Sequence, residues 1–217
     1  MKNLTLLFDM DGTLIDSTNA ILESFDAAFK KMGINFPNLD KIPPLIGYPL
    51  DIMFVKLGIK ADIADEFVKA YKEYYKTVAL KKTALTKDAK EAVEKAYEFA
   101  RLGVVTTKTS LYTKEILAHF GILHLFETIV GREDVKNTKP HPEPVLKALA
   151  AIDADNQNAW MIGDTVLDMS AGAAAGIKCA GVLCGYGKEE DLARYTNAIL
   201  KDTLEAVQYI KSVSCKK

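Results

Sequence analysis

The sequence is poor in the residues that build disulfide frameworks and sulfur–nitrogen metal sites, with three cysteines, three histidines and one tryptophan among its 217 residues. The cysteines, Cys179, Cys184 and Cys215, are odd in number and lack the close pairing of zinc ligands. Such a pattern is typical of free thiols in a reducing compartment. We therefore expect a cytoplasmic protein without structural disulfides.

Neither sign of charge dominates, and long apolar runs are missing. The chain has 28 Lys and Arg against 29 Asp and Glu, a formal net charge of −1, which argues against a nucleic-acid partner. The apolar run Leu4–Phe8 is shorter than the roughly 7–15 residues of an export signal core. No run approaches the roughly 18 residues of a membrane span. We expect no membrane partner either.

Apolar periodicity divides the chain into two kinds of pattern. After the first short apolar run, residues 16–83 carry amphipathic helical stripes and a proline-rich loop, whereas residues 84–217 alternate helical patterns with short strand-like runs. Strands that alternate with helices predict a parallel sheet with right-handed crossovers. We therefore expect an α/β, Rossmann-like core made of residues 1–15 and 84–217, with an all-helical domain of residues 16–83 inserted into it.

The most informative segment follows the first predicted strand. Asp9 and Asp11 leave that strand two residues apart and enter a Gly12–Thr13 turn. Two buried carboxylates are costly unless a cation compensates them, so this arrangement favours a metal-assisted site. Taken alone, the motif is short enough to occur by chance.

Further polar residues end later strands of the predicted sheet. Thr106, Thr107 and Lys108 follow one strand, and Asp164 and Asp168 follow another, while Lys139 lies in a turn before a helix. Parallel strands place their carboxyl ends at one edge, where open sheets bind ligands. Alone, Thr106 would be read as a turn residue, Lys139 as a surface charge, and Asp164 or Asp168 as a helix cap. Their order along the chain favours one shared site.

These motifs resemble those of haloacid-dehalogenase-superfamily phosphatases. Asp9-Met10-Asp11-Gly12-Thr13 is similar to the first family motif, Thr106 to the second, Lys139 to the third, and Gly163–Asp168 to the fourth. The helical insert between the first two motifs is similar to the cap domain of the branch that contains phosphoglycolate phosphatases and phosphoglucomutases. The resemblance covers nearly the whole chain.

The resemblance implies a role for each matching residue. Asp9 would be the nucleophile that forms an aspartyl-phosphate, and Asp11 the general acid and then the base. Thr106 and Lys139 would bind the phosphoryl oxygens, with Thr107, Lys108 and Gly47 as further substrate contacts. Mg²⁺ would be the cofactor, and its predicted ligand set is Asp9, Asp11 through its backbone carbonyl, Asp164 and Asp168. Asp168 would alternatively orient Lys139.

Departures from the family pattern narrow the prediction. The superfamily's dehalogenases and phosphonoacetaldehyde hydrolases lack the second aspartate, so Asp11 argues against both. Mutase activity is disfavoured because the insert contains neither His nor Arg, which also removes a guanidinium clamp for a second acidic group. Thr107 stands where these phosphatases usually have Asn.

The substrate expected from this resemblance is a small phosphorylated metabolite. Phosphoglycolate is the specific expectation, and pyrophosphate or a sugar phosphate fits the same core. A phospho-ligand-binding protein without catalysis is the alternative from another functional class, and the presence of both Asp9 and Asp11 disfavours it. The chain is expected to be a monomer or a homodimer.

Overall fold

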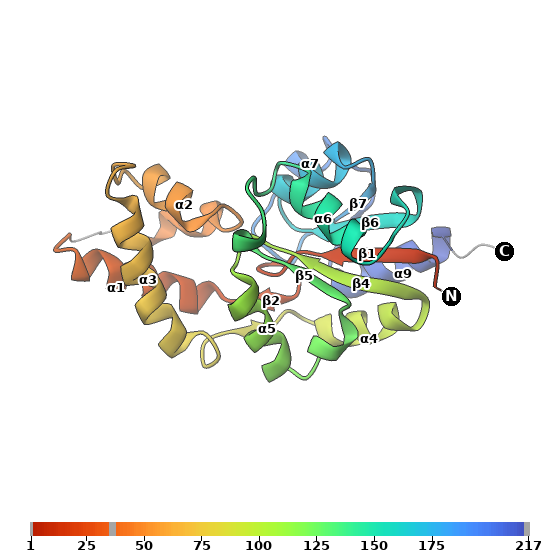
Figure 1. Ribbon diagram of the computed structural model, residues 1–217, viewed down its shortest axis with the longest axis horizontal. Helices are drawn as coiled ribbons and strands as arrows, with labels where there is room; N and C mark the ends of the chain where they lie inside the picture. Colours follow the sequence, from red (N-terminus) through yellow and green to blue (C-terminus); the bar gives the residue numbers. More distant parts are fainter. Residues whose placement is uncertain (1, 35–37, 215–217) are drawn as a thin grey trace. The chain divides into compact units, whose positions relative to one another are not determined.

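The computed structural model describes residues 2–34 and 38–214 of the chain, so Cys215 lies outside the described residues. Figure 1 shows the elements. The strands are β1 (Leu4–Phe8), β2 (Ile15–Asp16), β3 (Ala84–Leu85), β4 (Ala100–Val105), β5 (Thr128–Val130), β6 (Ala159–Gly163), β7 (Lys178–Val182) and β8 (Ile199–Leu200). The α-helices are α1 (Thr18–Lys31), α2 (Leu50–Lys56), α3 (Ala64–Val78), α4 (Ala89–Phe99), α5 (Ser110–His119), α6 (Glu143–Ala151), α7 (Val166–Ala174), α8 (Glu189–Leu192) and α9 (Thr203–Ser214). Short 3₁₀ helices are η1 (Leu39–Lys41), η2 (Pro43–Leu45), η3 (Leu123–Leu125), η4 (Arg132–Asp134) and η5 (Asn156–Asn158).

The core is a six-stranded parallel sheet in the order β5-β4-β1-β6-β7-β8. β1 lies between β4, where Phe8 pairs with Val104, and β6, where Phe8 pairs with Ile162. The short strands β2 and β3 form a separate two-stranded sheet. The predicted Rossmann-like α/β class is confirmed, because the sheet is parallel and its strands alternate with helices along the chain.

Both faces of the sheet are covered by helices, which is why its central strands are apolar without alternation. On β1, Leu6 and Phe8 belong to a buried cluster with apolar side chains of α4, α5 and α9. Leu7, which points to the opposite face, belongs to a second cluster with side chains of α6 and α7. The two layers fix β1 from both sides and hold the residues that follow it.

The strand order reverses beside β1. From β1 the chain passes to β4 and β5 on one side, and later returns to β6, β7 and β8 on the other side. Ligands of open parallel sheets bind where the strand order reverses in this way. The reversal lies between β1 and β6, the strands that precede Asp9 and Asp164.

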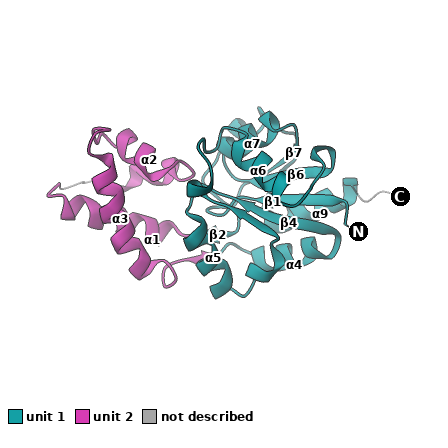
Figure 2. Cartoon of the chain, viewed as in Figure 1, with its two compact units in different colours: residues 1–16, 85–217 teal, residues 17–84 magenta. Residues whose placement is uncertain are grey.

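The chain divides into two compact units, drawn in different colours in Figure 2. One unit consists of residues 1–16 and 85–217 and contains the sheet, and the other consists of residues 17–84. The second unit, called the helical unit below, contains α1, α2 and α3. Among the described residues, no helix is both long and apolar enough to cross a bilayer.

An aromatic cluster forms the centre of the helical unit. Phe54 of α2 contacts Phe25 and Phe29 of α1, with ring centroids 4.6 and 5.7 Å apart, and Phe67 of α3 at 5.4 Å. Phe54 is fully buried. Edge-to-face and tilted ring pairs add to the free energy of burial, so this cluster holds the three helices together.

The sequence predicts a helix whose first residue is Pro49 and a strand over residues 178–184, and both boundaries differ in the structure. Pro49 is the N-cap of α2, which begins one residue later at Leu50, because the backbone of Pro49 is extended. The strand expected to run to Cys184 ends at Val182, where pairing with β8 ends at Leu200. The residues that follow β7 are therefore a loop, and this loop contributes to the site described next.

The Phe54→Ala substitution should lower the free energy of unfolding by about 3–5 kcal/mol, because it removes a buried ring from the centre of the cluster. Chemical denaturation followed by circular dichroism measures this change. The control is Val55→Ala on the same helix, whose side chain is 41% exposed and should cost less than about 1 kcal/mol. Equal effects of the two substitutions would contradict the assignment of this core.

Candidate active site

The turn that follows β1 is held by its own backbone. The carbonyl oxygen of Met10 accepts hydrogen bonds from the N–H groups of Leu14 and Ile15 at 2.9 and 3.0 Å, and the N–H of Asp9 donates to the carbonyl of Ile162 on β6. Gly12 has a φ of +87°, and a Cβ at this position would lie 2.3 Å from a carboxylate oxygen of Asp164. Glycine is therefore required here for both conformation and space.

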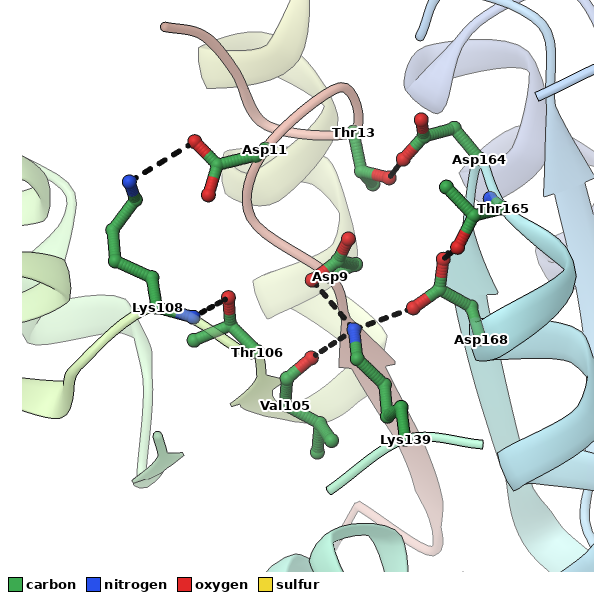
Figure 3. Close-up of polar contacts among 10 residues, drawn as sticks. All are labelled: Asp9, Asp11, Thr13, Val105, Thr106, Lys108, Lys139, Asp164, Thr165 and Asp168. Carbon is green, nitrogen blue, oxygen red and sulfur yellow. Dashed lines mark hydrogen bonds and ion pairs between the residues drawn. The ribbon is translucent and has the colours of Figure 1, made fainter. Parts of the chain in front are cut away.

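Lys139 connects the ends of three elements. Its Nζ donates to Asp9 Oδ1 at 2.7 Å, to Asp168 Oδ1 at 2.5 Å and to the carbonyl oxygen of Val105 at 2.9 Å. The side chain is 2% exposed. Figure 3 shows its ammonium group between these three acceptors. All three donors of the ammonium are thereby used, which fixes Lys139 beside Asp9.

The loop that carries Lys139 is ordered by a carboxylate at the start of α6. Glu143 accepts hydrogen bonds from the backbone N–H groups of Lys136 and Asn137 at 2.8 and 2.9 Å, and from the Asn137 side chain. These bonds lower the pKa of Glu143. His141 accepts from the Glu143 N–H, so it supports the loop.

Burial and charge shift the pKa values in this cluster. Burial and the neighbouring Asp168 raise the pKa of Asp9 to about 7, although Lys139 opposes the shift. Burial also raises the pKa of Asp164 well above its ordinary value, and Asp168 and Asp9 add to the effect. Burial alone would lower the pKa of Lys139, but Asp168 and Asp9 outweigh it and raise that pKa. Lys139 alone therefore does not supply enough positive charge to balance this group of carboxylates.

Asp164, directly after β6, is oriented through both of its carboxylate oxygens. Thr13 donates its hydroxyl to Oδ1 at 2.9 Å, and the backbone N–H of Tyr186 donates to Oδ2 at 2.8 Å. The side chain is fully buried. The second of these bonds comes from the loop after β7, which the sequence analysis did not include in the site.

Glycines allow that loop to approach Asp164. A Cβ on Gly185 would lie 2.1 Å from Asp164 Oδ2, and a Cβ on Gly187 would lie 1.9 Å from the Asp164 carbonyl oxygen. The Gly185-Tyr186-Gly187 sequence was the available signal, because paired glycines indicate close backbone approach. The predicted strand ends at Cys184, just before these residues, so they are not predicted to belong to the site.

Asp168 both caps helix α7 and pairs with Lys139. Its Oδ2 accepts from the N–H and the hydroxyl of Thr165, at 3.0 and 2.6 Å, and so caps the start of α7. Its Oδ1 accepts from Lys139. Thr165, and not Asp164 or Asp168, is the N-cap residue of α7. The geometry matches the alternative in which Asp168 orients Lys139.

Asp11 points away from this cluster and pairs with Lys108. Their Oδ1 and Nζ atoms are 3.2 Å apart, and both side chains are about nine-tenths buried. Figure 3 shows this pair on the other side of Asp9 from Asp164. Thr106 is buried and accepts from the N–H of Lys108 at 3.1 Å, and the half-buried Thr107 lies between them.

The structure brings together most of the predicted site residues. Asp9, Asp11, Thr106, Lys139, Asp164 and Asp168 all lie at the carboxyl edge of the sheet, with Thr107 and Lys108 in the same turn as Thr106. Gly47 belongs to the helical unit, between η2 and α2, with a φ of +109°. Its contact with substrate stays a prediction.

Asp9, Asp164 and Asp168 form a group that fits a divalent cation. One carboxylate oxygen from each lies within 4.8 Å of the others, and all three residues are buried. Three carboxylates beside one lysine leave two negative charges when all are ionised. Oxygen donors of this kind suit hard cations such as Mg²⁺. The carboxylate of Asp11 is not part of this group. Ligation of the ion by the backbone carbonyl of Asp11 stays a prediction.

Comparison with known proteins identifies the family. Residues 6–182 match the family described as Haloacid dehalogenase-like hydrolase. The chain belongs to this family. The predicted superfamily resemblance is thus confirmed.

Several known proteins resemble this chain along most of its length. It is 31% identical over 216 residues to the pyrophosphatase PpaX of Anoxybacillus flavithermus, covering 98% of both chains. It is 27% identical over 195 residues to a phosphoglycolate phosphatase of Photorhabdus laumondii, covering 87% of this chain and 83% of the relative. The crystal structure of a putative haloacid dehalogenase-like hydrolase from Bacteroides fragilis superposes with a TM-score of 0.88 at 27% identity, covering 94% of this chain and 99% of the other.

The Gly185→Ala substitution tests the geometry around Asp164. The added methyl group must displace the carboxylate or the Gly12 carbonyl, 2.6 Å from it. We expect the Mg²⁺ concentration for half-maximal thermal stabilisation to rise at least about tenfold.

Gly181→Ala is the control for this substitution. The three atoms nearest to a Cβ on Gly181 all belong to the side chain of Leu192, the first at 3.1 Å, so the Mg²⁺ dependence should not change. An unchanged Mg²⁺ dependence in Gly185→Ala would contradict the role given to Asp164.

Proposed function

We propose that this hydrolase is a Mg²⁺-dependent phosphatase that acts on a small phosphorylated metabolite through an aspartyl-phosphate on Asp9. The observation that carries the proposal is the position of Asp9. Its carboxylate accepts a hydrogen bond from the buried Lys139 and lies close to carboxylate oxygens of the buried Asp164 and Asp168, a group that could hold a divalent cation. The phosphatase names of relatives similar along most of the chain support the same reaction class.

The first chemical step is the attack of an Asp9 carboxylate oxygen on the substrate phosphorus. A P–O bond to Asp9 forms, and the P–O bond to the leaving group breaks. The positive charge of Lys139, whose three N–H groups are bonded to Asp9, Asp168 and Val105, stabilises the negative charge that spreads over the phosphoryl oxygens, and the hydroxyl of Thr106 would donate to one of them. A Mg²⁺ ion bound to Asp9 and Asp164 would cancel the repulsion between the anionic nucleophile and the anionic phosphate.

Asp11 provides the proton for the leaving group. Its carboxyl group protonates the departing oxygen, and its carboxylate then accepts a proton from the water that attacks the aspartyl-phosphate. That second attack breaks the P–O bond to Asp9 and releases inorganic phosphate. The position of Asp11, apart from the Lys139 cluster and paired with Lys108, supports a role on the leaving-group side.

The same pair supports a substrate class. Lys108 presents a largely buried ammonium group beside the proposed acid, where it would meet a leaving group that carries its own negative charge. Phosphoglycolate has this property through its carboxylate. Pyrophosphate has it through its second phosphate, and it is the second candidate because a relative similar over 98% of its length is named a pyrophosphatase.

Replacement of the nucleophile gives the direct activity test. Asp9→Asn should lose more than about 10³-fold in turnover, because an amide cannot form the phosphoenzyme, while the circular dichroism spectrum stays unchanged. Excess chelator should stop wild-type phosphate release, and added Mg²⁺ should restore it. Near-normal turnover by Asp9→Asn, or full activity in chelator, would overturn the mechanism.

The role of Lys108 is tested by comparing substrates in the Lys108→Met variant. We expect kcat/KM for phosphoglycolate and pyrophosphate to fall about 10- to 100-fold, since a charged contact is lost. Glycerol 2-phosphate, whose leaving alcohol is neutral but needs the same protonation, should lose less than about threefold.

The control is Lys114→Met, which removes the charge of an exposed lysine on α5. This substitution should not alter kcat/KM for any of the three substrates. An equal loss on all three substrates in Lys108→Met would mean that Lys108 acts only through Asp11. In that case Lys108 would not select the substrate.

A further inference from the structure

The carbonyl oxygen of Thr13 receives two buried hydroxyl groups. Thr86 donates its Oγ1 hydrogen to it at 2.8 Å, and Thr203 donates at 2.6 Å. The donors come from distant parts of the chain, 73 and 190 residues away from Thr13. A carbonyl oxygen has two lone pairs, so these bonds use its full capacity.

Both donors are fixed by the sheet-containing unit. Thr86 follows β3, and its backbone N–H donates to the carbonyl of Leu14 at 3.0 Å, so it is bound to the catalytic turn at two points. Thr203 is the first residue of α9 and is fully buried. The helix packs on the sheet through Ala206, Val207 and Ile210. The two hydroxyls therefore hold the turn against rigid elements.

Thr13 also connects the restrained turn to Asp164. Its side-chain hydroxyl donates to Asp164 Oδ1 at 2.9 Å, while its backbone carbonyl is held by Thr86 and Thr203. Because one residue carries both groups, fixing its backbone fixes the direction of its hydroxyl. The Asp164 carboxylate is then held at the angle set by Thr13 on one oxygen and Tyr186 on the other.

The arrangement differs from ordinary buried hydroxyl bonds in the same protein. Thr113 and Ser24 are also buried, but each bonds to the carbonyl four residues earlier in its own helix. Such local bonds satisfy the hydroxyl without tying elements together. Thr86 and Thr203 converge on a single carbonyl beside a candidate metal ligand, which a purely local role does not require.

We propose that Thr86 and Thr203 are positioning residues for the metal site, acting through Thr13 on Asp164. Neither residue needs to touch the ion or the substrate. The inference rests on the Mg²⁺ site proposed above and extends it to two residues outside the family motifs. Outer residues that orient metal ligands commonly change metal affinity when replaced.

The experiment compares Thr86→Val and Thr203→Val, alone and combined, with the corresponding Ser variants. Valine keeps the shape and removes the hydroxyl, whereas serine keeps the hydroxyl. The readout is the Mg²⁺ concentration that gives half of the maximal rise in melting temperature, measured without substrate. We expect about a 3- to 10-fold increase for each Val variant and about 10- to 100-fold for the double variant. The Ser variants should stay within about twofold of wild type.

Thr113→Val controls for the loss of any buried hydroxyl. It should lower the melting temperature in the absence of Mg²⁺ without changing the Mg²⁺ dependence. If the double variant does not fold, the single variants decide, because each leaves the Thr13 carbonyl one donor.

Two results would overturn this inference without affecting the proposed metal site. One is an unchanged Mg²⁺ dependence in the Val variants, and the other is an equal change in the Val and Ser variants, which would assign the effect to packing. If Mg²⁺ fails to stabilise the wild-type protein at all, the proposed metal site falls and the inference falls with it.

Discussion

Mutual repulsion among buried carboxylates is the constraint on which the rest of this structure depends. Asp9, Asp164 and Asp168 approach within 4.8 Å of one another at the edge of the sheet, away from bulk water. Lys139 compensates one of the three charges and is itself buried. Breaking a buried ion pair by removing one partner typically costs about 3–5 kcal/mol. The negative charge that Lys139 does not balance favours the binding of a cation at this site.

The surrounding structure holds these groups in place instead of relaxing the repulsion. Gly12 and Gly185 bring backbone close to Asp164 where a methyl group would collide. Asp168 is restrained by the cap of α7 as well as by Lys139. Because these groups are already fixed, they lose little conformational freedom when an ion or a phosphoryl group binds. This is the physical basis of preorganised catalysis. The price is a raised pKa at Asp9 and at Asp164 in the absence of an ion.

The sequence predicts the parts of the site that depend on strand ends. Asp9, Thr106 and Asp164 each follow an apolar run, and parallel pairing brings such positions to one edge. Lys139 was found through its motif, and the structure adds its bonds to Asp9, Asp168 and Val105. Thr86 and Thr203 were not found, because their hydrogen bonds to the site join residues far apart in sequence. Local periodicity carries no signal for such contacts.

The central claim is that Asp9 becomes covalently phosphorylated during turnover. The most direct measurement is an acid quench of wild-type protein during hydrolysis of phosphoglycolate or pyrophosphate, followed by peptide mass spectrometry. The account predicts the added mass of one phosphoryl group on the peptide that contains Asp9, dependent on Mg²⁺ and localised to that carboxylate. Rapid phosphate release with an unmodified Asp9, or with phosphate on another residue, would contradict it.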